Sequence, residues 1–479
     1  MARYREYNQK QTFLMPVQPE VVLRNNRLAG EINRFVEEWV STERFSVKAE
    51  NDQGGAAAIH PKLMLKVIFY SYATGMTTTR GMEKRLGEDI VYQVLAANET
   101  IDHSTICNFL NRYRAEITEI FQELNYLLWK MGHIDMEFIA IDGTKIEANA
   151  SRERVASIEE YRLIQSQMSE RIEAWLEKAQ EVGITEQEEK GLQRMQRKRE
   201  KIDEVLEALK SEKIQVEEKT RIHLSDPDAR LMRDKDRTYV GYNAQAAVDG
   251  KNDFIVGQNV FQQAADAPLF QSMVEVVKEI SDNELKNTEI AADAGYFSSE
   301  NLNYGQQQDL NIYLPEGKGE GGKKEIISEG ITSRDCKKEI EGAMRRLICP
   351  GNQVMETTKA RHHNAGKFYY FFSPRRNECD NCSLKQKCYG NSKSAKTFKV
   401  KKEYFDTLLL QQQMNHKLSS PYGKSRLMAR ASTIEHVFGF IKEALSFRRF
   451  FHRGLQKVRL IWSILCIAYN LRRLASLNC

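Results

Sequence analysis

The fold is decided by the stretch Met136-Glu-Phe-Ile-Ala-Ile-Asp142-Gly-Thr-Lys-Ile-Glu-Ala-Asn149. Apolar and small residues run directly into an aspartate and a glycine, a pattern typical of a buried strand that carries a carboxylate to the edge of a sheet. The same pattern recurs at Glu289-Ile-Ala-Ala-Asp293-Ala-Gly295-Tyr-Phe. Because two such carboxylates can share a divalent cation, we expect Asp142 and Asp293 to form one metal site, which Glu435 completes.

Length and charge set the first bounds. A chain of 479 residues predicts more than one domain or large insertions. The formal net charge is only +5, but the basic residues are concentrated toward the C-terminus, where residues 421–479 hold eleven Lys or Arg against two Glu. This excess indicates either a solvated basic face or a surface for a polyanion such as DNA.

The N-terminal residues form no apolar signal region, and no run of eighteen apolar residues occurs. The apolar run 460–465 is too short for a membrane span. We therefore expect a cytoplasmic protein with no membrane segment. In that reducing compartment, the eight cysteines favour metal binding over disulfides.

Residues 1–130 are predicted to form a helical N-terminal DNA-binding domain. Within it, the segment 101–114 starts with a capping Asp102 or Ser104 and ends on basic residues. It fits either the recognition helix of a helix-turn-helix or an ordinary bundle helix. Residues 151–222 predict a helical hairpin insertion with a glycine stop at Gly183 and a capping box from Thr185 to Glu188.

This hairpin has two interpretations. It is a packing or dimerisation arm, or it follows a DNA backbone through a group of basic residues: Arg194, Arg197, Lys198 and Arg199.

The remaining segments predict an α/β core made of residues 131–150, 223–315 and 424–479. The core is interrupted by an insertion at 316–423, which opens with the glycine-rich linker 317–324 and contains cysteines. The expected elements of the core are strands at 238–249 and 253–260, a helix capped by Asp266, the Asp293 strand, a helix from Ser298, a strand at 311–315 and a helix at 455–476.

Phosphodiester chemistry at two divalent ions needs carboxylates, and Glu435 is the candidate for the third. It lies beside a predicted buried helix stripe formed by Ile434, Val437, Phe438 and Ile441. Lys442 follows two helical turns later on the same side, where it suits contact with a phosphate. Four competing acids rank lower because they fit turns, a strand end and a helix cap: Asp226, Asp228, Asp249 and Asp266.

Several motifs together resemble the catalytic blocks of bacterial insertion-sequence DDE transposases. They are Asp142-Gly-Thr, Ala292-Asp293-Ala-Gly-Tyr-Phe, Ile434-Glu435-His-Val-Phe-Gly-Phe-Ile-Lys442 and Phe447-Arg-Arg-Phe, together with Ser225-Asp-Pro-Asp-Ala-Arg230 and Val240-Gly-Tyr-Asn-Ala-Gln-Ala-Ala-Val-Asp249. The resemblance covers nearly the whole chain. It extends to the branch with an N-terminal helical domain and a cysteine-bearing insert.

The resemblance implies an α/β fold with an RNase H-like mixed sheet, in which Asp142, Asp293 and Glu435 bind two Mg²⁺ or Mn²⁺ ions. It also implies an enzyme that cuts insertion-sequence ends and joins them to target DNA, as a homodimer on terminal inverted repeats, in the bacterial cytoplasm at the nucleoid. Lys442 matches the lysine that follows the glutamate in this family, and the other candidate DNA contacts are Arg430, Arg448, Arg449 and Arg453.

One position departs from the family pattern. The arginine expected four residues before the glutamate is Ala431 here, so Arg430 is only a substitute for it. Two other functions stay open for the same fold: a catalytically inactive DNA-binding relative, and a nuclease that cuts without joining.

The insertion carries the spacing Cys379-x2-Cys382-x5-Cys388, with Cys349 upstream beside Pro-Gly. Four thiols with one Cys-x2-Cys knuckle favour a small zinc-binding-like module with a structural Zn²⁺ over unrelated surface cysteines. The spacing is also compatible with an iron-sulfur cluster.

Overall fold

The computed structural model describes residues 18–46, 58–211, 217–234, 237–280, 285–317, 331–333, 335–363, 367–375, 379–388, 390 and 396–477. The predicted linker 317–324 lies outside these residues from position 318 onward. The chain divides into two compact units. Unit 1 consists of Met1–Asp135, Gly143–Ala264 and Ile434–Cys479, and unit 2 of Met136–Asp142 and Ala265–Thr433.

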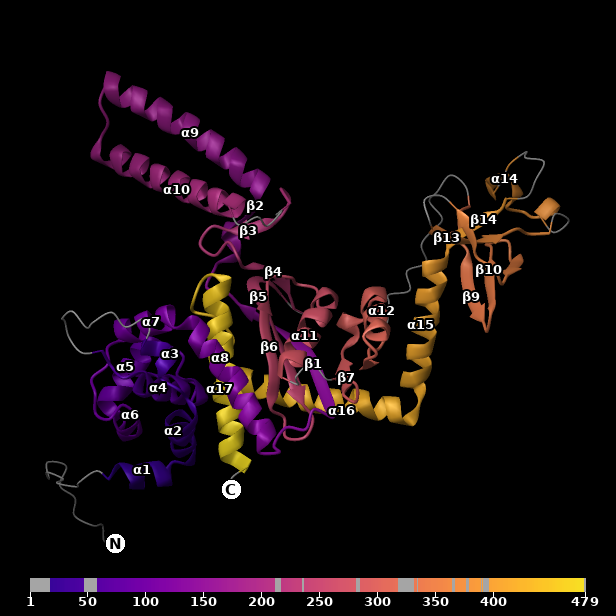
Figure 1. The fold of residues 1–479 in the computed structure, drawn as a ribbon. Coiled ribbons are helices and arrows are strands. Elements are labelled where there is room, and N and C mark those ends of the chain that lie inside the picture. Colours follow the sequence, from indigo (N-terminus) through magenta and orange to yellow (C-terminus); the bar gives the residue numbers. More distant parts are fainter. Residues whose placement is uncertain are drawn as a thin grey trace, which may run out of the picture. The chain divides into compact units, whose positions relative to one another are not determined.

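The N-terminal part of unit 1 is helical, as predicted (Figure 1). Its helices are α1 (Pro19–Asn25), α2 (Arg27–Trp39), α3 (Glu43–Ser46), α4 (Pro61–Ala73), α5 (Thr79–Glu88), α6 (Ile90–Leu95), α7 (His103–Arg112) and α8 (Arg114–Lys130). Asp102 caps α7 by accepting from the backbone amides of Ser104 and Thr105, which confirms the predicted helix start. The C-terminal helix α17 (Leu455–Leu477) packs against α2, α4 and α8, so the two ends of the chain share a core.

Helix α17 is also the one helix of the described chain that is long and apolar enough to cross a membrane. Its apolar window is 78% buried inside the protein, however. Trp462 in this helix is fully buried, and its indole N–H donates to the carbonyl of Gln245 at 3.1 Å. The burial accounts for the apolar composition by packing in the protein core.

The predicted helical hairpin is present as α9 (Ile158–Glu181) and α10 (Glu186–Ser211), which pack side by side (Figure 1). Gly183 at the bend has a φ of +78°, where glycine is favoured. The capping box is formed in both directions, because the Thr185 amide donates to Glu188 and the Glu188 amide donates to Thr185. A two-stranded ribbon, β2 (Val155–Ser157) with β3 (Arg221–His223), closes the base of the hairpin.

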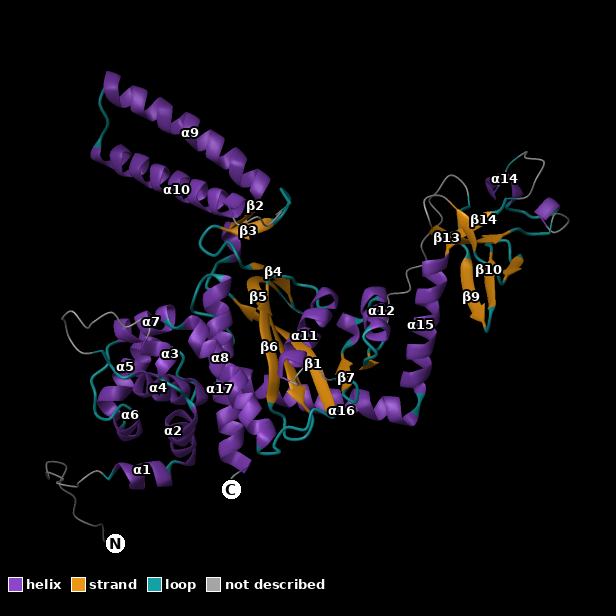
Figure 2. Cartoon of the chain, in the orientation of Figure 1, coloured by secondary structure: helices purple, strands orange, loops and turns teal. Residues whose placement is uncertain are grey.

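The central sheet is mixed, which confirms an α/β class (Figure 2). Its strand order is β4-β5-β1-β7-β8, with β6 paired to β5. The strands are β1 (Phe138–Glu147), β4 (Arg230–Arg233), β5 (Thr238–Asp249), β6 (Ile255–Phe261), β7 (Glu289–Ala292) and β8 (Asn311–Tyr313). Strands β4, β5 and β6 pair antiparallel, whereas β1, β7 and β8 pair parallel. Strand β1 starts in unit 2 and continues into unit 1 after Asp142.

Unit 2 contains the connections around β7 and β8. They are η2 (Ala267–Leu269), α11 (Phe270–Ile280), η3 (Ala294–Tyr296) and α12 (Ser299–Gln307). Ser298 caps α12 by accepting from the amide of Asn301, as a helix start at this serine predicts.

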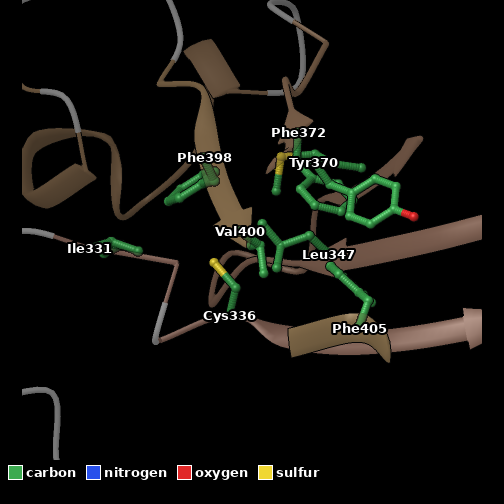
Figure 3. Close-up of a cluster of buried hydrophobic side chains, with 9 residues drawn as sticks. Ile331, Cys336, Leu347, Tyr370, Phe372, Phe398, Val400 and Phe405 are labelled. Carbon is green, nitrogen blue, oxygen red and sulfur yellow. The ribbon is translucent and has the colours of Figure 1, made fainter. Parts of the chain in front are cut away.

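The cysteine insertion folds as two small antiparallel sheets in unit 2 (Figure 2). The first contains β9 (Lys337–Glu341), β10 (Met344–Ile348) and β11 (Val354–Thr357), and the second β12 (Arg361–His363), β13 (Lys367–Phe372) and β14 (Phe398–Lys401). The short helix α14 (Lys385–Cys388) comes before β14 in the chain. Two long helices come after β14: α15 (Lys402–Ser419) and α16 (Pro421–Gly439). A small apolar cluster, drawn in Figure 3, fills the interior of this module.

Candidate active site

Asp142 and Asp293 are brought together by the register of two parallel strands. Strands β1 and β7 pair Ile141 with Ala292, and each aspartate is the next residue along its own strand. Neighbouring strands lie about 4.8 Å apart, so Asp142 and Asp293 occupy adjacent backbone positions. Asp293 comes directly after β7, as predicted, but the prediction that Asp142 ends its strand is wrong, because β1 continues to Glu147. Both side chains are half-buried. The register thus gives the two aspartates neighbouring backbone positions, and their convergence on one metal site stays a prediction.

The backbone beyond Asp142 is fixed by close packing in unit 1. A Cβ atom on Gly143 would lie 2.0 Å from Nε2 of Gln245, so only glycine fits. Gln245 is fully buried on β5 and donates to the side chain of Asn243 at 2.9 Å. Asn243 in turn donates to the carbonyl of Gln263. This polar pair lies against Gly143, the residue after Asp142 on β1.

A third carboxylate approaches Asp293. A Cβ atom on Gly295 would lie 3.0 Å from Oδ1 of Asp293 and 3.5 Å from Oδ2 of Asp266. The glycine thus leaves open a space bordered by two carboxylates. Asp266 is the N-cap residue of η2, as predicted, but within the described chain its side chain makes no capping hydrogen bond with that helix. The preceding bend aims its carboxylate toward Asp293 instead.

Helix α16 brings basic residues to both ends of the parallel strands. Arg430 forms an ion pair with Asp142 at 3.2 Å, at the carboxyl edge. Arg426, one turn earlier, lies 3.0 Å from the carboxylate of Glu289, where β7 begins. Tyr422 also donates to Glu289. Arg430 thus contacts a predicted catalytic aspartate, Asp142, whereas Arg426 and Tyr422 contact Glu289.

Glu435 belongs to unit 1 and is exposed on α16. The predicted buried stripe beside it is confirmed, since Ile434, Val437, Phe438 and Ile441 are all buried. The placement of Lys442 on the same α-helix is wrong. The α-helix ends at Gly439, and Lys442 lies in a π-helical turn, Phe440–Ala444. A π turn changes the angular step per residue, so the α-helical count from Glu435 to Lys442 does not apply.

The other predicted DNA-contacting residues, three arginines, come after this π-helical turn in the sequence. Arg449 lies 3.8 Å from Glu147 and donates to the carbonyl of Ala148. Arg453 donates to the carbonyl of Asn149, and Arg448 is paired with Glu443. All three arginines are exposed. Each of them therefore has a contact within unit 1 beside the end of β1.

The competing acids have structural contacts. Asp226 is fully buried and accepts from the Tyr242 hydroxyl at 2.6 Å and the Gly454 amide at 3.0 Å. Burial raises the pKa of this carboxyl above its ordinary value. Asp228 accepts from the Leu455 amide at 2.8 Å. Asp249 closes β5, as predicted, and accepts from the Lys251 amide.

Carboxylate oxygens are the ligands that a hard divalent cation prefers, and those of Asp293 and Asp266 both lie beside Gly295, whose amide donates to Asp293. Over the described residues, the structure groups no three His, Cys, Asp or Glu side chains closely enough to share a metal ion. Asp142 and Asp293 are therefore the pair that the fold brings together, and Glu435 belongs to the other unit.

Two segments of the chain match family models of transposases. Residues 348–475 match the model described as a transposase DDE domain, and residues 18–112 match the one described as a transposase domain (DUF772). Together the two matches indicate an insertion-sequence DDE transposase. The first match contains Glu435, whereas Asp142 and Asp293 lie outside both. A search among curated proteins gives no match.

Two features of the site had only weak sequence signals. Asn243 and Gln245 are polar residues at alternate positions of an otherwise apolar strand, which hints at a shared function on one face. Asp266 has no such signal, because its approach to Asp293 depends on how η2 and η3 pack.

Proposed function

We propose that this transposase cleaves the ends of an insertion sequence and joins the liberated 3′-hydroxyls to target DNA. The observation that carries the proposal is the parallel register of β1 and β7, which sets Asp142 beside Asp293 at one edge of the sheet. A parallel arrangement of strands with acids at their carboxyl ends supports an RNase H-like core. Glu435 is the third acid of the proposed set.

In this proposal Asp142, Asp293 and Glu435 hold two Mg²⁺ or Mn²⁺ ions. When bound, such ions lower the pKa of the attacking hydroxyl and stabilise the charge on the leaving oxygen. The half-buried aspartates supply fixed negative charge on rigid strand ends, which positions the reacting groups. Arg430 supplies a positive charge beside Asp142 that can contact the phosphate of the scissile strand.

The proposed DNA surface contains Lys442, Arg448, Arg449 and Arg453. The arginines lie on an exposed segment beside the end of β1, the strand that carries Asp142. The homodimer is proposed because two element ends must be joined in one reaction.

The test uses the full-length chain and a duplex that carries an element end, taken from the DNA flanking the gene. With Mg²⁺, we expect Asp142→Asn and Asp293→Asn to lower the cleavage rate on the order of a thousandfold, because each removes a charge that holds the ions. Glu300→Gln, an exposed acid on α12, is the matched control and should cleave normally. Cleavage retained by Asp142→Asn would overturn the mechanism.

The same assay separates the two other functions. A nuclease of this fold would give nicked ends without strand-transfer products on a target plasmid. An inactive DNA-binding relative would bind the duplex and leave it uncut.

A further inference from the structure

Four cysteines of the insertion line one small cavity in unit 2. Cys349 comes from the turn after β10, and Cys379, Cys382 and Cys388 come from the segment that ends in α14. The cavity has a volume of about 20 Å³, which is room for one water-sized sphere or one ion. Two stretches of chain that are far apart in sequence thus line one cavity with their thiols.

Gly351 lies where the two stretches of chain come close together. A Cβ atom at this position would lie 2.8 Å from Sγ of Cys382 and 3.7 Å from Sγ of Cys349. A side chain here would therefore press on the thiol of Cys382. Glycine leaves that thiol room beside Cys349.

Each of these two sulfurs also accepts a backbone hydrogen bond. The Gln353 amide donates to Sγ of Cys349 at 3.4 Å, and the Leu384 amide donates to Sγ of Cys382 at 3.4 Å. Hydrogen bonds to sulfur stabilise the thiolate, which is the form that binds metal. Tight turns set both bonds, since the Asn352 amide donates to the Cys349 carbonyl and the Cys382 amide to that of Cys379.

The charge around the cavity suits a set of thiolates. Lys385 and Lys396 are among its lining residues, so two cations lie beside the sulfurs. Four thiolates with one divalent ion carry a net charge of −2, which two lysines offset.

A fifth cysteine nearby has a different role. Cys336 is 4% exposed within the apolar cluster of Figure 3, and its thiol donates to the carbonyl of Thr332 at 3.4 Å. Burial raises the pKa of this thiol to about 12. Cys336 therefore packs as an apolar residue in this cluster.

The module also has a small core. Its buried cluster contains nine residues: Ile331, Cys336, Leu347, Met355, Tyr370, Phe372, Phe398, Val400 and Phe405. Small modules commonly need a metal or disulfides to supplement such a core. Because thiolates are soft ligands, four of them select zinc over the hard cations that carboxylates bind.

We propose that Cys349, Cys379, Cys382 and Cys388 bind one structural zinc ion that stabilises the β9–β14 module. Within the described chain, no three of these groups are close enough to share an ion as they stand. Rotation about their Cα–Cβ bonds brings the thiolates to the ion on binding. Four protein ligands leave no open position, so the zinc has a structural role and is separate from the carboxylate site.

The first test is metal analysis of the purified full-length chain, without a metal-binding tag. We expect about one zinc per chain by mass spectrometry. Exchange for Co²⁺ should give the visible and near-ultraviolet bands of tetrahedral thiolate coordination. Absence of zinc after growth with added zinc would overturn the proposal, as would iron with acid-labile sulfide, which indicates an iron-sulfur cluster.

The second test assigns the ligands. Cys382→Ser and Cys388→Ser should bind zinc at least about tenfold more weakly. Cys336→Ala, in the same module, and Cys107→Ser, on α7, are controls that should retain one zinc. Loss of zinc in Cys336→Ala would overturn the ligand set. If a ligand variant unfolds, the metal content and cobalt spectrum of the unmodified chain still decide the proposal, and neither depends on DNA cleavage.

Discussion

Two arginines one turn apart on α16 have different functions at the residue scale. Arg430 is paired with Asp142 at 3.2 Å, where the strands end, whereas Arg426 is 3.0 Å from Glu289, where β7 begins. Glu289 also accepts from the hydroxyls of Tyr313 and Tyr422. Arg426 therefore belongs to a structural network, and Arg430 is placed to influence the aspartates.

We expect Arg430→Gln to strengthen divalent metal binding about tenfold. The guanidinium beside Asp142 repels a dication, and its removal leaves the carboxylate to the metal. The same variant should cleave DNA more slowly at saturating Mg²⁺, because a phosphate contact is lost. Binding is measured by Mn²⁺ titration with electron paramagnetic resonance.

Arg426→Gln is the matched comparison for this prediction. Its metal affinity should be unchanged, while the free energy of unfolding should fall by about 1 kcal/mol as Glu289 loses its ion pair. The loss is small because the Nε of Arg426 lies near the carboxylate without a well-aligned hydrogen bond. Equal Mn²⁺ affinities for Arg430→Gln and the unmodified chain would contradict the assigned role.

At the element scale, the start of α17 is held by the turn at residues 226–228. Asp226 accepts from the Gly454 amide, and Asp228 accepts from the Leu455 amide at 2.8 Å and from the Gln262 side chain at 2.9 Å. The first amides of a helix have no partner within it, and their dipoles favour negative charge. A motif distant in sequence thus supplies the cap for the longest buried helix of unit 1.

Asp228→Ala should lower the free energy of unfolding by about 1–2 kcal/mol, since it removes the cap of α17. Urea denaturation followed by circular dichroism measures the change. Gln456→Ala, exposed in the first turn of the same helix, is the control and should be nearly neutral. Equal stabilities for the two variants would show that Asp228 does not cap the helix.

At the scale of the whole molecule, unit 1 is assembled from stretches at both ends and the middle of the chain. Asn470 on α17 connects them, and it is fully buried. Its amide donates to Asn125 on α8 at 3.0 Å and to the Ile255 carbonyl on β6 at 2.9 Å, while its oxygen accepts from the Ile255 amide at 2.9 Å. One side chain therefore joins the N-terminal helices, the sheet and the C-terminal helix.

Asn470→Ala should destabilise the protein by roughly 3 kcal/mol, because it leaves both backbone groups of Ile255 buried without their partner. Thermal unfolding should show a lower Tm for unit 1. Ser476→Ala is the control, since that exposed hydroxyl donates only to its own helix, at the Arg473 carbonyl. A Tm equal to that of the control would contradict the proposed connection.

Local chemistry made part of this structure predictable. The Asp102 cap and the Thr185–Glu188 box act over three residues or fewer, so the sequence alone places both helix starts. The buried strand that carries Asp142 was predictable from its apolar run, but its end was not, because β1 continues to Glu147. The capping partner of Asp226 was not, since Gly454 is 228 residues away.

The sequence by itself determined most elements, the strand that carries Asp142 and the position of Asp293 directly after a strand, because apolar periodicity and caps depend on near neighbours. Only the tertiary structure decided which long-range pairs form: the Ile141–Ala292 register, Arg430 beside Asp142, Asp266 beside Asp293, and the four thiols at one cavity. It also placed Lys442 in a π turn rather than in the α-helix. These arrangements depend on how distant surfaces pack, and no local pattern encodes that packing.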